Sequence, residues 1–297
     1  MTETPLFLVG APRSGTSLLY KALCLHRDVG YISNWVARFP AAPQLAVANR
    51  LAAHLPSAQR RVWFGGGDSA YVYGTRRSLW ARAFPMPVEG EPVYRHAGVP
   101  EAAASGDANV RAALARAFAR VRRASGGTVV VSKRIANNRR IPLLATAFPE
   151  ARFVELVRDG RAVAASLRRV DWWPESRLWW RDDVTPSAAE AAGADGWELC
   201  ARAWVEEAAA ARNGLATLDP GRVLSTTYER FVAAPHAVLD EVAGFGRVQP
   251  GDDRWRRRLA SVRFPDRNQA WRTDLPADAI ATIERVQATA LTSHGYA

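Results

Sequence analysis

The sequence is poor in several features, and each shortage excludes a class of protein. Its two cysteines, Cys24 and Cys200, lie far apart and fit no metal-binding or disulfide pattern, so we expect buried thiols in a reducing compartment. No uninterrupted run of about 18 apolar residues occurs, so no membrane span is predicted. The N-terminal MTETP lacks the basic and then apolar order of a signal peptide. These shortages together predict a cytoplasmic protein.

Lysine is also scarce, although the chain is strongly basic. Lys21 and Lys133 are the only lysines among 40 basic residues, and the formal net charge is +11. Such an excess suggests an anionic partner, which could be nucleic acid, a membrane surface or a small polyanion. The arginines are mostly scattered in pairs, and only those at 254–258 cluster tightly, beside two aspartates. Without a zinc-finger, basic-zipper or RNP signature, we expect solvated surface charge and no nucleic-acid partner.

Short apolar runs alternate with segments of helical periodicity, which favours an α/β fold with a mainly parallel sheet. No serine- and glycine-rich linker and no repeat divides the chain, so a single domain over 1–297 is predicted. Residues 60–105 read as loops with short helical pieces. The expected strands are 5–10, 128–132, 151–157 and 222–228, and the expected helices are 14–26, 43–55, 108–124, 138–148, 160–170, 185–213, 235–244, 252–261 and 277–291.

The segment LVGAPRSGTSLL, residues 8–19, has the glycine spacing of a phosphate-binding loop between a strand and a helix. Gly10 and Gly15 keep the Walker A frame, but Thr16 occupies the lysine position and Ser17 follows. Backbone N–H groups and a helix N-terminus suit phosphate or sulfate. With Arg13 as the cation, such a loop can bind one tetrahedral anion without a metal. The alternative is an ordinary turn in which the glycines are incidental.

A second group of polar residues follows the strand expected at 151–157. Arg158 comes directly after this strand, and Ser166 lies two turns into the next helix. Both can therefore reach one point at the carboxyl edge of the sheet, where ligands bind in open α/β proteins. Asp159 resembles a Walker B magnesium ligand, but Asp159 and Gly160 also form an ordinary turn into a helix. We expect Arg158 to contact a ligand.

Together, FLVGAPRSGTSLL and FPEARFVELVRDGRAVAASL resemble the sulfotransferases that use 3′-phosphoadenosine 5′-phosphosulfate (PAPS). The likeness is to the branch with a PRSGT-type loop, which includes tyrosylprotein, carbohydrate and many bacterial enzymes. It implies a three-layer, P-loop-like fold, PAPS as the donor and no metal. It also implies that Arg158 and Ser166 hold the 3′-phosphate. The residues implied for the 5′-phosphosulfate are Arg13, Ser14, Gly15, Thr16 and Ser17. A donor that carries sulfonate in place of a magnesium-bound γ-phosphate explains the missing lysine.

The resemblance continues over most of the chain. VVVSKRIANNRRIPLLATAFPEA implies Lys133 near the transferred sulfonate, although Ile135 stands where the family often has proline. VLSTTYERFVAAPHAVL implies that Tyr228 contacts the nucleotide. FPDRNQAWR occupies the place of the loop that covers the nucleotide, which makes Arg267 and Asn268 candidates, but the Arg-Lys-Gly of the cytosolic branch is absent.

Sulfonate transfer also needs a general base to accept the proton of the acceptor, and in this family it is Glu or His. We predict Glu89, in the proline-rich segment 84–96. Glu91 and His96 lie in the same segment and stay alternatives. The segment 30–35 and His26 are further options, although His26 also suits the C-terminus of the first helix.

The acceptor is expected to be a small molecule, a sugar or a lipid-like compound with a hydroxyl or amine. Four tryptophans form either an aromatic wall for this acceptor or the packing of a lid. They are Trp172, Trp173, Trp179 and Trp180. Two other functions remain open: a nucleoside kinase or ATPase in which Asp159 binds magnesium, and a basic nucleic-acid-binding protein.

Overall fold

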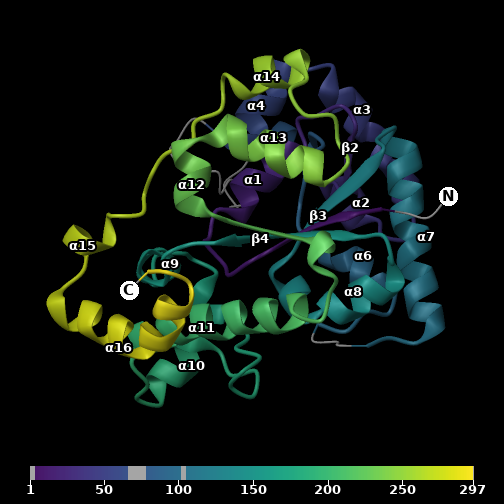
Figure 1. Cartoon of the computed structure of the whole chain (residues 1–297). Helices are drawn as coiled ribbons and strands as arrows, with labels where there is room; N and C mark the ends of the chain where they lie inside the picture. Colours follow the sequence, from purple (N-terminus) through teal and green to yellow (C-terminus); the bar gives the residue numbers. More distant parts are fainter. Residues whose placement is uncertain (1–3, 66–77, 102–104, 297) are drawn as a thin grey trace.

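A parallel β-sheet of five strands forms the centre of the computed structural model, which describes residues 4–65, 78–101 and 105–296 (Figure 1). The strand order is β2-β3-β1-β4-β5, so β1 is the middle strand. The strands are β1 (Leu6–Val9), β2 (Val29–Tyr31), β3 (Val129–Lys133), β4 (Arg152–Val157) and β5 (Val223–Thr227). All four pairs of neighbours are parallel, which confirms the α/β class expected from the sequence.

Helices connect the strands and cover both faces of the sheet (Figure 1). The α-helices are α1 (Thr16–Leu23), α2 (Asn34–Arg38), α3 (Ala48–Ala53), α4 (Pro56–Phe64), α5 (Leu79–Ala83), α6 (Glu91–His96), α7 (Ala108–Ser125), α8 (Ile141–Ala147), α9 (Gly160–Leu167), α10 (Pro186–Ala191), α11 (Gly196–Leu215), α12 (Tyr228–Ala233), α13 (Pro235–Phe245), α14 (Asp253–Leu259), α15 (Trp271–Asp274) and α16 (Ala277–Ser293). Short 3-10 helices are η1 (Pro43–Val47), η2 (Ile135–Arg139), η3 (Trp173–Glu175) and η4 (Pro220–Arg222).

The alternation of side chains along β1 divides the core between the two faces of the sheet. Leu6 and Leu8 pack with α1, α4, α13 and α14 on one face. Phe7 and Val9 pack with α6, α7 and α8 on the other face. Because successive strand residues point to opposite faces, a continuous apolar strand needs helices on both sides. The result is the three-layer arrangement that the sequence predicts.

Strand β1 lies between β3 and β4, so three strands that are separated along the chain end side by side. Leu8 pairs with Lys133 at the end of β3, and Val9 pairs with Glu155 on β4. The chain leaves β1 and β4 directly into the loops that precede α1 and α9. In open α/β sheets this is the edge at which ligands bind.

Several predicted boundaries are wrong for identifiable reasons. The helix predicted over 185–213 is two helices, α10 and α11, because Gly193 adopts φ 92° and Asp195 caps a new helix at Trp197 and Glu198. The helix predicted over 138–148 begins only at Ile141, after η2. Strand β2 was not predicted, because three residues are too few to show a strand pattern.

Both cysteines are buried free thiols, as expected. Within the described part of the chain, no helix has both the length and the apolar character that a bilayer span requires.

Candidate active site

A cleft of about 950 Å³ opens at the carboxyl edge of the sheet. Its lining residues come from the ends of four strands: Arg13 after β1, Lys133 at the end of β3, Arg158 after β4 and Tyr228 after β5. Residues of the segment 261–274 close its other side. The structure thus brings together the groups that the sequence analysis placed at this edge.

The loop between β1 and α1 has an unusual backbone that depends on its glycines. Gly10 has φ 143° and Gly15 has φ 89°, and Arg13 itself adopts φ 65°. A Cβ atom on Gly10 would lie 2.4 Å from the carbonyl oxygen of Leu156, and one on Gly15 would lie 2.6 Å from the ring of Tyr228. Glycine is therefore required at both positions by backbone conformation and by close packing. This excludes the interpretation of the loop as a turn with incidental glycines.

A buried asparagine holds the start of this loop. Asn138 accepts a hydrogen bond of 2.9 Å from the Gly10 N–H and donates one of 3.1 Å to the Gly10 carbonyl. Its amide also donates to Glu207 of α11 at 2.7 Å. Glu207 is buried, accepts from Arg139 and from Trp179 Nε1, and burial raises its pKa. The phosphate-type loop is thus connected through one carboxylate to α11 and to the tryptophan-rich segment.

The polar residues of the loop divide between the cleft and the core. Thr16 and Ser17 line the cleft, whereas Ser14 is fully buried and its hydroxyl oxygen has no partner among the described residues. Arg13 Nε donates to Ser166 Oγ at 2.9 Å. The two anion-binding groups expected from the sequence are therefore in direct contact.

Arg158 is fixed by protein acceptors on three sides. Its guanidinium donates to the carbonyl oxygens of Arg13 at 2.9 Å and Arg267 at 2.8 Å, and to Asn268 Oδ1 at 3.2 Å. The guanidinium carbon lies 4.1 Å from the ring centre of Tyr228, whose hydroxyl donates to the Pro265 carbonyl at 2.7 Å. Burial lowers the pKa of Arg158, which remains a cation. Arg267 lines the cleft, whereas Asn268 is buried behind Arg158.

Lys133 and Glu89 form an ion pair in the cleft. Lys133 Nζ bonds to Glu89 Oε1, and Arg134 Nη1 donates to Glu89 Oε2 at 2.7 Å. Only 6% of the Lys133 side chain and 27% of the Glu89 side chain are exposed. Burial raises the pKa of Glu89, but Lys133 and Arg134 outweigh this effect and bring it to about 2. The carboxylate is ionised and lies beside a cation that can contact a bound anion.

A sequence profile of the sulfotransferase family matches residues 5–249. The chain belongs to the sulfotransferase family. It is a PAPS-dependent sulfotransferase, as the resemblance predicted. Membership of the PRSGT-loop branch stays a prediction. A comparison with curated proteins gave no match.

Solved structures share the fold of this sulfotransferase at low sequence identity. The sulfotransferase STF9 from Mycobacterium avium is 17% identical with a TM-score of 0.59, and the match covers 99% of this chain and 77% of that one. STF1 from Mycobacterium tuberculosis is 15% identical with a TM-score of 0.56, over 97% and 77% of the two chains. The sulfotransferase domain from the curacin biosynthetic pathway is 14% identical with a TM-score of 0.54, over 97% of both chains. These likenesses confirm the fold.

The alternative bases do not line the cleft of the sulfotransferase. Glu91 binds Arg140 through both oxygens, at 2.8 and 2.9 Å, and His96 is exposed at the end of α6. His26 is buried beyond the end of α1, where its ring packs against Trp255 and burial lowers its pKa. Residues 30–35 form β2 and the start of α2, away from the cleft lining. Glu89 is therefore the candidate base that the geometry favours.

The four tryptophans have different environments. Trp172 lines the cleft, whereas Trp173 is buried under α11. Trp179 donates to Glu207 and lies under the guanidinium of Arg139, 4.9 Å from ring centre to carbon. Trp180 is half-buried and packs against the apolar cluster that contains Trp173. Of these four tryptophans, only Trp172 lines the cleft, and the other three pack against the protein.

Asp159 does not have the surroundings of a magnesium ligand. It caps α9 by accepting from the Arg161 N–H at 2.9 Å, and its carboxylate also binds the Arg161 guanidinium. No group of three or more His, Cys, Asp or Glu side chains that could hold a metal occurs among the residues with described positions.

Sequence reasoning missed Asn138, Glu207 and Arg134, which support the site from outside the loop motifs. Asn138 and Glu207 lie 69 positions apart, so their contact has no local signal. Arg134 directly follows Lys133, and this Lys-Arg pair after a strand was the available signal.

Proposed function

We propose that this enzyme transfers the sulfonate of PAPS to a hydroxyl or amine of a small-molecule acceptor by in-line displacement. The observation that carries the proposal is the convergence of Arg13, Arg158 and Lys133, from three strand ends, on one cleft that also contains Glu89. The three cations suit the binding of an anionic donor, and the adjacent carboxylate suits the acceptance of a proton. We take the chain to act as one domain over residues 1–297.

The proposed donor position follows the lining of the cleft. The 5′-phosphosulfate lies at the loop of Arg13, Gly15, Thr16 and Ser17, near the N-terminus of α1. The 3′-phosphate lies between Arg158 and Ser166. Because Arg13 Nε already bonds to Ser166 Oγ, the two phosphate positions adjoin. Tyr228 and Arg267 contact the nucleotide, and Asn268 and the buried Ser14 support the site from behind.

In the proposed reaction, the acceptor oxygen or nitrogen attacks sulfur while the bond from sulfur to the bridging phosphate oxygen breaks. The electron pair of that bond stays on adenosine 3′,5′-bisphosphate, and the acceptor proton passes to Glu89. Arg13 and Lys133 stabilise the negative charge on the sulfonate and the leaving oxygen. The products are the sulfated acceptor and the bisphosphate.

The ion pair suggests how Glu89 becomes a stronger base during the reaction. A carboxylate with a pKa of about 2 holds a proton weakly. When a sulfonate approaches Lys133, the ammonium shares its charge with the donor, and Glu89 loses part of its largest stabilising partner. The pKa of Glu89 then rises at the stage when a proton has to be accepted.

The donor assignment is tested by calorimetry with adenosine 3′,5′-bisphosphate and AMP. We expect the bisphosphate to bind about 10- to 150-fold more tightly, since a charge-assisted hydrogen bond is worth about 1.5–3 kcal/mol. Equal affinities would refute a 3′-phosphate site at Arg158. Binding of ATP that depends on magnesium would favour the kinase alternative.

The catalytic assignment is tested by PAPS turnover with a panel of phenols, alcohols and amines. Lys133→Ala and Glu89→Gln should each reduce turnover about 10²- to 10⁴-fold and leave bisphosphate binding within a few-fold. Glu101→Gln is the control, because Glu101 also contacts Arg134, at 3.6 Å, but lies 59% exposed outside the cleft. Normal turnover of Glu89→Gln would show that the base is another residue.

A further inference from the structure

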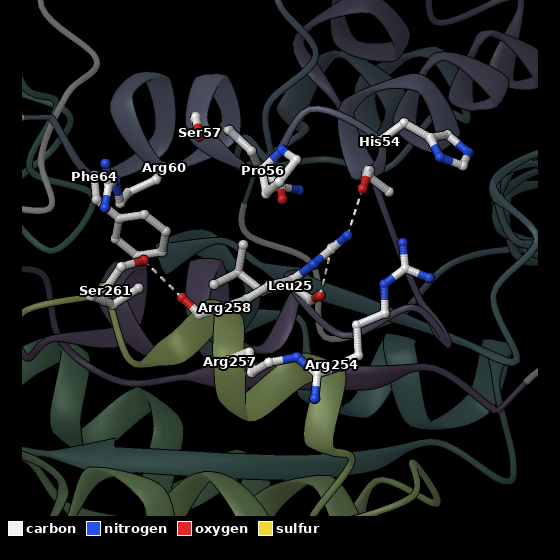
Figure 2. A pocket seen from close by; sticks show the side chains of 13 residues that line it. Leu25, His54, Pro56, Ser57, Arg60, Phe64, Arg254, Arg257, Arg258 and Ser261 are labelled. Carbon is white, nitrogen blue, oxygen red and sulfur yellow. Dashed lines mark hydrogen bonds between the residues drawn. The ribbon is translucent and has the colours of Figure 1, made fainter.

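A second cavity, of about 520 Å³, lies beside the donor cleft. Figure 2 shows arginines of α14 on one side of it, and residues of α4 together with His54, which directly follows α3, on the other. Four arginines line the cavity: Arg60, Arg254, Arg257 and Arg258. Arg60, Phe64 and Ser261 line both this cavity and the donor cleft, so the two spaces adjoin.

Three of the four arginines of α14 line this cavity because of their spacing along the helix. Positions 254, 257 and 258 share one face of a helix, since they are three and four residues apart. Arg256 lies on another face, where it forms an ion pair of 3.0 Å with Asp240. Arg256, whose charge is paired, therefore faces away from the three arginines of α14 that line the cavity.

Within the described part of the chain, the cavity arginines form no ion pair with a carboxylate. Among the described residues, no carboxylate lines the cavity, and Arg60, Arg254 and Arg257 make no ion pair. The neighbouring Asp252 is occupied in capping α14 at the Trp255 N–H and in a pair with Arg27. Like charges around one cavity repel one another, and an anion bound between them removes this cost. Consistent with the crowding, burial and the charge of Arg254 both lower the pKa of Arg258.

Helix α14 is held against the neighbouring helices by hydrogen bonds. Arg258 donates to the carbonyl oxygens of Leu25, at 3.2 Å, and of Ala53 (Figure 2). Trp255, on the face of α14 that packs into the core, is buried and donates to the Ala22 carbonyl at 2.9 Å. Helix α14 is thus attached to α1 and α3, so its backbone and the Arg258 guanidinium are in place before a ligand binds.

We propose that this cavity is a binding site for a small polyanion that carries more than one phosphate or sulfate group. The guanidinium forks suit phosphate and sulfate oxygens, and their number suits more than one such group. The volume is within the range of small-molecule sites. Because the cavity adjoins the donor cleft without including its loop, the polyanion and the nucleotide bind at the same time. This inference rests on the cavity alone and is independent of the sulfonate acceptor.

The test is calorimetric titration with sodium tripolyphosphate after the donor cleft has been saturated with adenosine 3′,5′-bisphosphate. We expect one further site. Arg254→Gln and Arg257→Gln should each weaken it about tenfold or more, as the loss of one charge-assisted bond implies. Arg256→Gln removes the same charge from the same helix and should change the affinity less than threefold.

Three results would overturn the proposal. The first would be that tripolyphosphate does not bind to the saturated enzyme, which would limit polyanion binding to the donor cleft. Alternatively, all three variants lose affinity equally, which indicates attraction to the overall charge of +11. Finally, the ratio of bound tripolyphosphate to protein is well above one, which indicates non-specific surface binding.

Discussion

Replacement of Asn138 by alanine should damage both the stability of the fold and the binding of the donor. The change removes two hydrogen bonds to the Gly10 backbone and one to the buried Glu207. Neutral bonds contribute about 0.5–1.5 kcal/mol each and a bond to a charged group about 1.5–3 kcal/mol, so we expect a loss of about 2.5–6 kcal/mol. For a chain of this size, that lowers the melting temperature by about 5–10 °C.

Asn137 provides the matched control, because it is the adjacent residue, has the same side chain and is equally buried. Among the described residues, its amide donates only to Tyr94 Oη, at 3.1 Å, and makes no hydrogen bond to the loop. Asn137→Ala should therefore cost about 0.5–1.5 kcal/mol and leave adenosine 3′,5′-bisphosphate binding unchanged. The assays are urea unfolding and calorimetric titration of the bisphosphate. If the two variants lose equal stability and bind the bisphosphate equally, Asn138 does not hold the loop.

Three further predictions test other parts of the site. Because the folded structure lowers the pKa of Glu89 from 4.5 to about 2, the ionised carboxylate stabilises the fold above pH 4.5. This contribution, about 3 kcal/mol in total, is lost as the pH falls towards 2. In urea unfolding between pH 6 and 3, the free energy of unfolding should therefore decline less for Glu89→Gln than for the unmodified enzyme. Gly15→Ala introduces both strain at φ 89° and a clash with Tyr228, whereas Gly193→Ala introduces only the strain, at φ 92°. Thermal melting should therefore show a much larger loss for Gly15→Ala, and equal losses would exclude the clash. Arg13→Lys keeps the charge but loses the fork, so PAPS turnover should fall clearly, and full activity would show that Arg13 is not a bidentate anchor.

Strands and helices with strong local patterns could be predicted from the sequence, whereas breaks inside them could not. The apolar strands β1, β3, β4 and β5 and the capped helix α7 lie close to their predicted positions. The alanine-rich segment 185–213 favours helix throughout, so local propensity gave no reason to expect two helices. Gly193 and the capping residue Asp195 were the visible signals, but a single glycine is tolerated in many helices and an aspartate caps a helix only where the chain has already broken.

The strand ends predicted the site well, because parallel strands bring their following loops to one edge. Arg13, Lys133 and Arg158 all follow apolar runs, and all three line the cleft. The direction of each side chain could not be predicted, since it depends on distant partners. Ser14 points into the core, and Arg158 is bound by acceptors more than 100 positions away.

The fixed orientation of Arg158 has a consequence for the entropy of nucleotide binding. A guanidinium has five N–H bonds, and three nitrogen atoms here each use one of them on a protein acceptor. The two remaining N–H bonds, one on each terminal nitrogen, are left for a ligand. Ordering a long side chain during binding costs about 0.5–1.5 kcal/mol, and here folding has already met that cost. The chain segment at 265–268 therefore favours nucleotide binding by immobilising a residue that the nucleotide would otherwise have to immobilise itself.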